Sequence, residues 1–110
     1  IINVWKPIHG PVKQIPLAVC DARTIKLGQL LDSDIVYADR IGEVSMLTHA
    51  PEQQWYYVPE MLSTEVLLIK GFDSELCQAR FTAHSAFDDP TSDITAPPRE
   101  SIEVRTLAFF

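Results

Sequence analysis

Apolar and polar residues alternate along several short stretches of this chain, and residues that favour turns separate them. The first stretch covers residues 1–8, and we expect its strand to end near Pro7, because proline cannot donate a hydrogen bond to a sheet. A second covers residues 16–20, after which Asp21 suits the cap of a single helical turn. Further stretches rich in β-branched and aromatic residues predict strands at 43–49, 53–58, 65–72, 79–87 and 101–110.

Two segments do not follow this pattern. Leu27, Leu30 and Leu31 have helical spacing, but Gly28 opposes a helix by about 1 kcal/mol relative to alanine. We therefore predict a loop with one helical turn over residues 24–40. Residues 88–98 are rich in proline, aspartate, serine and threonine, which predicts a long surface loop.

Many short strands with almost no helix predict an all-β fold, an antiparallel sandwich, jelly roll or barrel formed by residues 1–110 as one domain or domain fragment. A closed jelly roll that holds a ligand usually needs more chain, and the sequence opens directly in strand-like residues. We expect an incomplete barrel that lacks its first part, with sheet edges that must be covered because exposed edges favour aggregation.

Composition narrows the function. Apolar residues make up 46% of the chain and charged residues 22%, as in ordinary soluble domains. A net charge of −6 argues against nucleic acid, since no basic cluster could neutralise phosphates. The apolar runs are too short for a membrane span or a signal peptide. We expect a protein of the cytoplasm, with Cys20 and Cys77 as reduced core residues.

Candidate chemistry lies on two polar strand faces. Alternation predicts that Arg80, Thr82 and His84 share one face and that Arg99, Ser101, Glu103 and Arg105 share another. Such faces are often simply solvated. An Arg-x-Ser pair on one face, however, offers a planar fork of donors beside a hydroxyl, which suits a carboxylate. An imidazole on the adjoining strand could then bind a metal at the other end of the same ligand.

Aromatic residues and the other histidines leave further alternatives. Trp55 and Tyr57 should share one face, and Trp5 should share a face with Asn3. Core packing is the ordinary role of such rings, and lining of a substrate pocket by Trp5, Trp55 or Tyr57 is the alternative. A three-histidine metal site of His9, His49 and His84 fits no short ligand motif, and the first two suit turns better.

Six segments, in this order and spacing, resemble one family across the whole chain: NVWKPI, PLAVCDART, QQWYYVPEM, EVLLIKGFDS, ARFTAHSAFDDP and PPRESIEVR. The family is that of gibberellin desaturase and the 7α-cephem-methoxylase chain, hydroxylases and desaturases of small molecules in fungal and bacterial secondary metabolism. Its members resemble iron(II)/2-oxoglutarate-dependent oxygenases with a double-stranded β-helix fold. The resemblance therefore implies Fe(II) and 2-oxoglutarate as cofactors and a small-molecule substrate.

The resemblance also implies roles for individual residues. His84 would bind the iron, Arg99 and Ser101 would hold the far carboxylate of 2-oxoglutarate, and Asn3 would touch it too. Arg105, on the same face as Arg99, is the alternative anchor. The family's H-x-D element would precede residue 1, and no such element occurs in the 110 residues, so we expect a C-terminal half whose N-terminal half carries it. The competing hypothesis is a non-catalytic jelly-roll module for binding or assembly.

Overall fold

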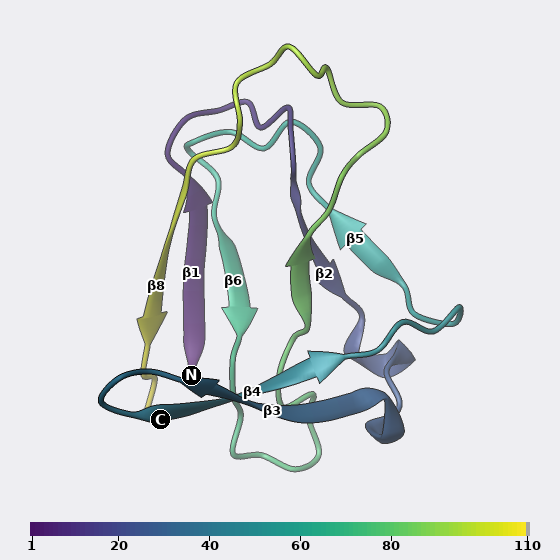
Figure 1. Ribbon diagram of the computed structural model, residues 1–110, viewed down its shortest axis with the longest axis vertical. Helices are drawn as coiled ribbons and strands as arrows, with labels where there is room; N and C mark the ends of the chain where they lie inside the picture. Colours follow the sequence, from purple (N-terminus) through teal and green to yellow (C-terminus); the bar gives the residue numbers. More distant parts are fainter. Residues whose placement is uncertain (110) are drawn as a thin grey trace.

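Six of the eight strands form two three-stranded antiparallel sheets in the computed structural model, which describes residues 1–109 (Figure 1). Sheet A has the order β6 (Leu67–Lys70), β1 (Ile2–Pro7) and β8 (Ser101–Thr106). Sheet B has the order β5 (Trp55–Tyr57), β2 (Leu17–Cys20) and β7 (His84–Ala86). No α-helix occurs within residues 1–109, which confirms the predicted all-β class.

The core lies between these two sheets. Trp5 and Ile69 of sheet A form one apolar cluster with Leu17 of sheet B, and Val12 and Met61 of the connecting segments complete it. Ile69 is only 1% exposed. Strand β1 explains this arrangement, because its side chains alternate between buried and half-buried positions along the whole strand. Each sheet thus has an inward face, which is the face turned to the other sheet.

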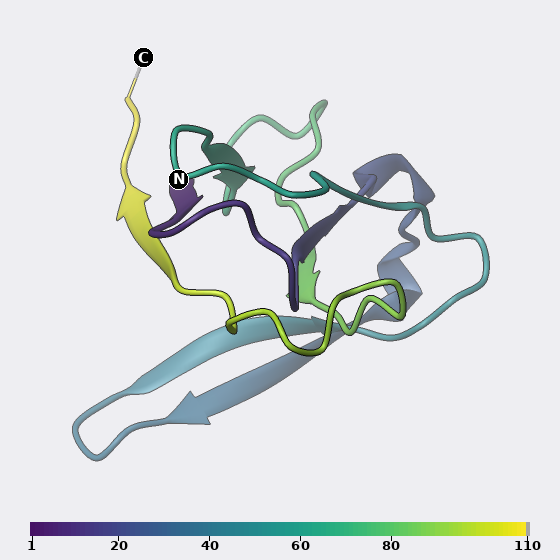
Figure 2. The same ribbon diagram turned by 90° about the horizontal axis from the view of Figure 1, so that it is seen from above.

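A two-stranded hairpin stands apart from the two sheets, as Figure 2 shows. It consists of β3 (Leu30–Val36) and β4 (Ile41–Leu47), with Leu30 opposite Leu47 and Val36 opposite Ile41. The prediction of a loop over 24–40 was therefore wrong for residues 30–36. The single helical turn predicted within this segment is confirmed as the 3-10 helix η2 (Leu27–Gln29), and a further 3-10 helix, η1 (Ala22–Thr24), follows Asp21.

Other sequence predictions held with shorter strands. Strand β1 ends at Pro7 and Asp21 caps η1, both as expected. The predicted strand at 79–87 is limited to residues 84–86, so Arg80 and Thr82 lie outside it. The last strand ends at Thr106, and residue 110 of the predicted range lies outside the described residues. Residues 88–98 form the predicted loop, without strand or helix.

The cysteines behave differently from each other. Both Cys20 and Cys77 are free, as predicted, and Cys20 is buried. Cys77 is exposed, so its expected place in the core was wrong. Among residues 1–109, no helix has the length and apolar character needed to cross a membrane.

Candidate functional site

His84 is the first residue of β7 and its side chain belongs to the inward face of sheet B. It pairs with Val19, and Ala86 pairs with Leu17. Residues that lie opposite each other in an antiparallel pair share a face, as do residues two apart in one strand. Since Leu17 packs against Trp5 in the core, His84 shares the face that looks toward sheet A. Its ring is exposed, and Nδ1 lies 2.9 Å from the carbonyl oxygen of Thr82.

The polar stripe of β8 also turns inward. Ser101 lies opposite Pro7, Glu103 opposite Trp5 and Arg105 opposite Asn3, and these three β1 residues form its buried face. A hydrogen bond from Nδ2 of Asn3 to Oε1 of Glu103 agrees with this register. The stripe therefore does not lie on the outer face of sheet A, which is the position that a simple solvated surface would have.

Arg99 lies just before β8 and bridges the two sheets. Its guanidinium carbon is 5.3 Å from the centroid of the Trp5 ring. Nη1 donates a hydrogen bond of 2.8 Å to the carbonyl oxygen of Ile15, which precedes sheet B. Partial burial lowers the pKa of the guanidinium through desolvation, although it stays charged at any physiological pH. No carboxylate of residues 1–109 forms an ion pair with Arg99, so most of its donors are available to an anion.

Asn3 has a polar atom that lacks a partner. The residue is 5% exposed, and its Oδ1 is buried without a hydrogen bond within the described residues. An unsatisfied buried acceptor of this kind costs about 1 to 3 kcal/mol. Because Oδ1 can only accept, its missing partner must be a hydrogen-bond donor. The inward face of β1 therefore has an unused acceptor.

The structure separates the sequence-predicted aromatic residues into two places. Trp5 is buried on the inward face beneath Arg99. Trp55 and Tyr57 do share a face, because they pair with Cys20 and Ala18. That face is the outer one of sheet B, opposite to the face of His84, so the register does not bring these two rings into the candidate site.

Trp55 and Tyr57 line a separate cavity of about 560 Å³ on the outer face of sheet B. Phe87 contributes to it, with its ring centroid 5.1 Å from that of Tyr57. The negative charge of Asp89, to which the Tyr57 hydroxyl donates a hydrogen bond, raises the pKa of this tyrosine. The cavity is largely aromatic, and His84 is not among the residues that line it.

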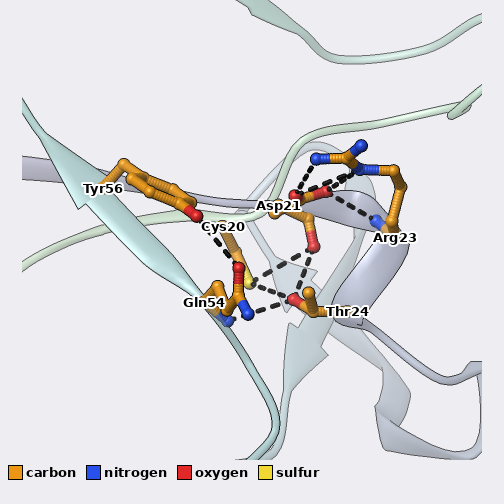
Figure 3. Close-up of polar contacts among 6 residues, drawn as sticks. All are labelled: Cys20, Asp21, Arg23, Thr24, Gln54 and Tyr56. Atoms are coloured by element: carbon orange, nitrogen blue, oxygen red, sulfur yellow. Dashed lines mark hydrogen bonds and ion pairs between the residues drawn. The ribbon is translucent and has the colours of Figure 1, made fainter.

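A polar network that the sequence did not indicate lies at the end of β2 (Figure 3). The guanidinium of Arg23 donates hydrogen bonds to both carboxylate oxygens of Asp21, and this contact lowers the pKa of Asp21 to about 2. The Thr24 hydroxyl donates to the Asp21 carbonyl oxygen and accepts from the backbone N–H of Gln54. The network thereby ties η1 to β5. The spacing of Asp21 and Thr24 was a usable signal for the cap, but nothing in the sequence indicated Gln54.

A complete metal site is not present in residues 1–109, where no three histidine, cysteine, aspartate or glutamate side chains come together as possible ligands. The three-histidine alternative is therefore excluded for this part of the chain. What the described residues offer is one inward imidazole whose Nδ1 is occupied, together with an unpaired guanidinium and a neighbouring hydroxyl. This set fits one ligand of a metal and the carboxylate of an organic acid.

Comparison with known proteins agrees with this chemistry. The family described as "YDMC: Oxidoreductase/YMDC permease-like domain" matches residues 1–109. The chain is 40% identical over 114 residues to aspirochlorine biosynthesis protein N of Aspergillus oryzae and covers 48% of it. It is 40% identical over 109 residues to the Fe(II)/2-oxoglutarate-dependent dioxygenase nvfI of Aspergillus novofumigatus and covers 39% of it. These matches include 100% and 97% of this chain.

A third relative and a solved structure extend the likeness. The hydroxylase/desaturase asaB of Aspergillus flavus is 38% identical over 125 residues, and the chain covers 55% of it. The structure of the iron and alpha-ketoglutarate-dependent endoperoxidase NvfI superposes with a TM-score of 0.85 at 36% identity. That match includes 93% of this chain and 38% of the other. The chain thus spans from 38% to 55% of the length of these proteins, and the predicted jelly-roll portion is confirmed.

Proposed function

Because the chain belongs to the oxidoreductase/YMDC permease-like domain family, we propose that it is the C-terminal portion of an iron(II)/2-oxoglutarate-dependent oxygenase. The activity would be hydroxylation or desaturation of a small molecule of secondary metabolism. The names of the relatives, dioxygenase and hydroxylase/desaturase, support this assignment. We also propose the narrower kinship with gibberellin desaturase and the 7α-cephem-methoxylase chain, which rests on the sequence segments alone. We further propose a cytoplasmic location, which suits the two free thiols.

Arg99 carries this proposal most directly. It is an inward, partly desolvated guanidinium without an acidic partner in the described residues, and one of its donors is already fixed on the Ile15 carbonyl oxygen. A fixed fork of this kind binds a carboxylate with little loss of side-chain freedom. Ser101, two residues further on the same face, adds a hydroxyl donor. Asn3, on the same inward face, would touch the acid through Nδ2, whose second N–H is not used by the hydrogen bond to Glu103.

His84 would bind the iron through Nε2. Strands β7 and β8 run in opposite directions (Figure 1), so that His84, the first residue of β7, and Arg99, two residues before β8, would lie toward opposite ends of these strands. Iron bound at His84 would supply the oxidising chemistry, in which 2-oxoglutarate and O2 are converted to succinate and CO2.

The protein's own part would be to bind and orient these groups. The Arg99 fork and the Ser101 hydroxyl would fix the acid at one end, and the His84 ring would fix the metal at the other. Trp5, packed beneath Arg99, would exclude water from the carboxylate contact and strengthen it. Each of these roles depends on a side chain that the register turns inward.

The other iron ligands would come from an N-terminal half that carries the H-x-D element. Strands β7 and β8 are edge strands of sheets B and A, so their outer backbone groups are free to pair with further strands. A strand added to β7 would lie directly beside His84. The outer face of sheet A also exposes Leu68 and Val104 by 69% and 53%, which is the kind of apolar surface that additional chain would cover.

The decisive test uses this chain joined to the N-terminal half proposed above, which we call the family-length protein. It measures succinate formation from 2-oxoglutarate with Fe²⁺. The change His84→Ala should reduce succinate to the level without enzyme. His49→Ala is the matched control, because His49 lies by the outer cavity of sheet B, and this variant should keep the full rate. Undiminished succinate formation by His84→Ala would refute the assignment of this residue as an iron ligand.

A further inference from the structure

The segment in front of β7 is attached to both sheets. The N–H of Thr82 donates a 2.8 Å hydrogen bond to the carbonyl oxygen of Lys70, at the end of β6 in sheet A. The next residue, Ala83, accepts a 2.8 Å hydrogen bond from the N–H of Cys20, at the end of β2 in sheet B. Residues 82 and 83 therefore connect the two sheets immediately before His84.

Lys70 and Cys20, to which this segment is hydrogen-bonded, lie in parts of the chain that further contacts fix. On the side of sheet A, Lys70 forms an ion pair of 2.7 Å with Asp73. On the side of sheet B, the network around Thr24 fixes the chain just beyond Cys20 (Figure 3). The buried thiol of Cys20 lies 3.8 Å from the hydroxyl of Thr24 within this network. The carbonyl group of Thr82 is consequently part of a fixed framework, although it lies outside any strand.

This carbonyl decides how the His84 ring is protonated. Its oxygen lies 2.9 Å from Nδ1 of the ring, and a carbonyl oxygen can only accept a hydrogen bond. The proton of the neutral imidazole must then be on Nδ1. The lone pair is left on Nε2, the nitrogen on the far side of the ring.

We propose that the main-chain carbonyl of Thr82 is a positioning group that holds His84 as the Nδ1–H tautomer and presents Nε2 to the site. Metal-bound histidines generally need such an outer partner, because it fixes the ring orientation and raises the basicity of the ligating nitrogen. The proposal rests on the proposed function for the identity of the ligand at Nε2. The tautomer itself can be observed without any metal.

The direct test is a long-range ¹⁵N–¹H spectrum of the metal-free, family-length protein at a pH where His84 is neutral. The change His84→Gln identifies the signal of this ring. The expected result is one tautomer with the proton on Nδ1. A ring protonated on Nε2, or a mixture of both tautomers, would overturn the proposal.

A pair of variants tests the framework behind the carbonyl. Thr82→Pro removes the N–H that bonds to Lys70, and Thr82→Val keeps the whole main chain. The proline variant should show mixed tautomers and bind Fe²⁺ about 10- to 100-fold more weakly in anaerobic equilibrium dialysis, while the valine variant should match the wild type. Equal behaviour of both variants and the wild type would contradict the proposal, and if the proline variant does not fold, the wild-type spectrum still decides.

These measurements separate the two proposals. A wild-type protein that shows the Nδ1–H tautomer but does not bind Fe²⁺ would keep the positioning role of Thr82 and refute the oxygenase. A protein that binds Fe²⁺ through His84 in the other tautomer would keep the oxygenase and refute the positioning role.

Discussion

Arg99 lies over the indole ring of Trp5, with its guanidinium carbon 5.3 Å from the ring centroid. The contact joins the residue before β8 to the buried face of β1, and the bond to the Ile15 carbonyl oxygen adds a second fixed point. A long and flexible side chain is thereby limited to few conformations. The chemistry that we propose for Arg99 depends on this restriction as much as on its charge.

Replacing this guanidinium should weaken binding of 2-oxoglutarate. In the family-length protein, Arg99→Lys keeps the charge but loses the planar fork, and we expect the KM for 2-oxoglutarate to rise about 10- to 100-fold. Arg105→Lys, on the same face near the other end of β8, is the matched control and should have little effect. A large rise for Arg105→Lys with none for Arg99→Lys would move the carboxylate anchor to Arg105.

Asn3 offers a test of the inward face through stability. The change Asn3→Asp places a carboxylate beside that of Glu103, where the amide now donates a hydrogen bond. Repulsion should raise the pKa of this carboxyl pair, so that the variant is stable at low pH and loses about 1 to 3 kcal/mol as the pH rises through the raised pKa. Urea denaturation at pH 4 and pH 8 measures the difference. Equal losses at the two pH values would argue against this contact.

The ion pair at the end of β2 predicts a titration with a defined sign. The hydrogen bond from Arg23 lowers the pKa of Asp21 to about 2, below its ordinary value of 3.8. The stabilisation from this contact is complete above pH 4 and is lost as the pH falls toward 2. Arg23→Gln should return the pKa toward 3.8 in a carboxyl NMR titration. Lys26→Gln is the control, since Lys26 lowers the pKa of Glu52 and should leave that of Asp21 unchanged.

Two glycines provide a matched pair for packing. A Cβ added at Gly10 would lie 2.7 Å from the backbone nitrogen of Ser63 and 2.9 Å from the Cα of Leu62, so the main chain would have to move. We expect Gly10→Ala to destabilise the protein by about 1 to 3 kcal/mol in denaturant melts. Gly28→Ala meets no atom within 4 Å and should be neutral or slightly stabilising. The reverse order of the two effects would contradict the close approach at Gly10.

The strands were largely predictable because their alternation is local information. Residues 30–36 were not predicted as a strand, because Leu30 and Leu31 follow Leu27 at a spacing that also suits a helix. Pairing with β4, and the stacking of Arg40 on Tyr37 at the turn, decided the outcome. These are contacts between segments, and a linear pattern does not contain them.

For the site, alternation correctly placed Ser101, Glu103 and Arg105 on one face, but it could not tell inward from outward. The packing of Trp5 against Leu17 determines that direction for both sheets. The same limit applies to Trp55, whose shared face with Tyr57 was predicted although its side of the sheet was not. The carbonyl oxygens of Ile15 and Thr82 leave no trace in the sequence, because every residue has one.

The position of β7 and β8 at the sheet edges has a thermodynamic consequence. If the remaining iron ligands arrive on strands that pair with these edges, iron binding and strand pairing become linked equilibria. Thermodynamic linkage then requires that bound iron raise the affinity of the two halves for each other by a certain factor. Association of the halves must raise the affinity for iron by the same factor. Depletion of iron would then weaken strand pairing beside His84, whereas the apolar cluster around Trp5 needs no metal.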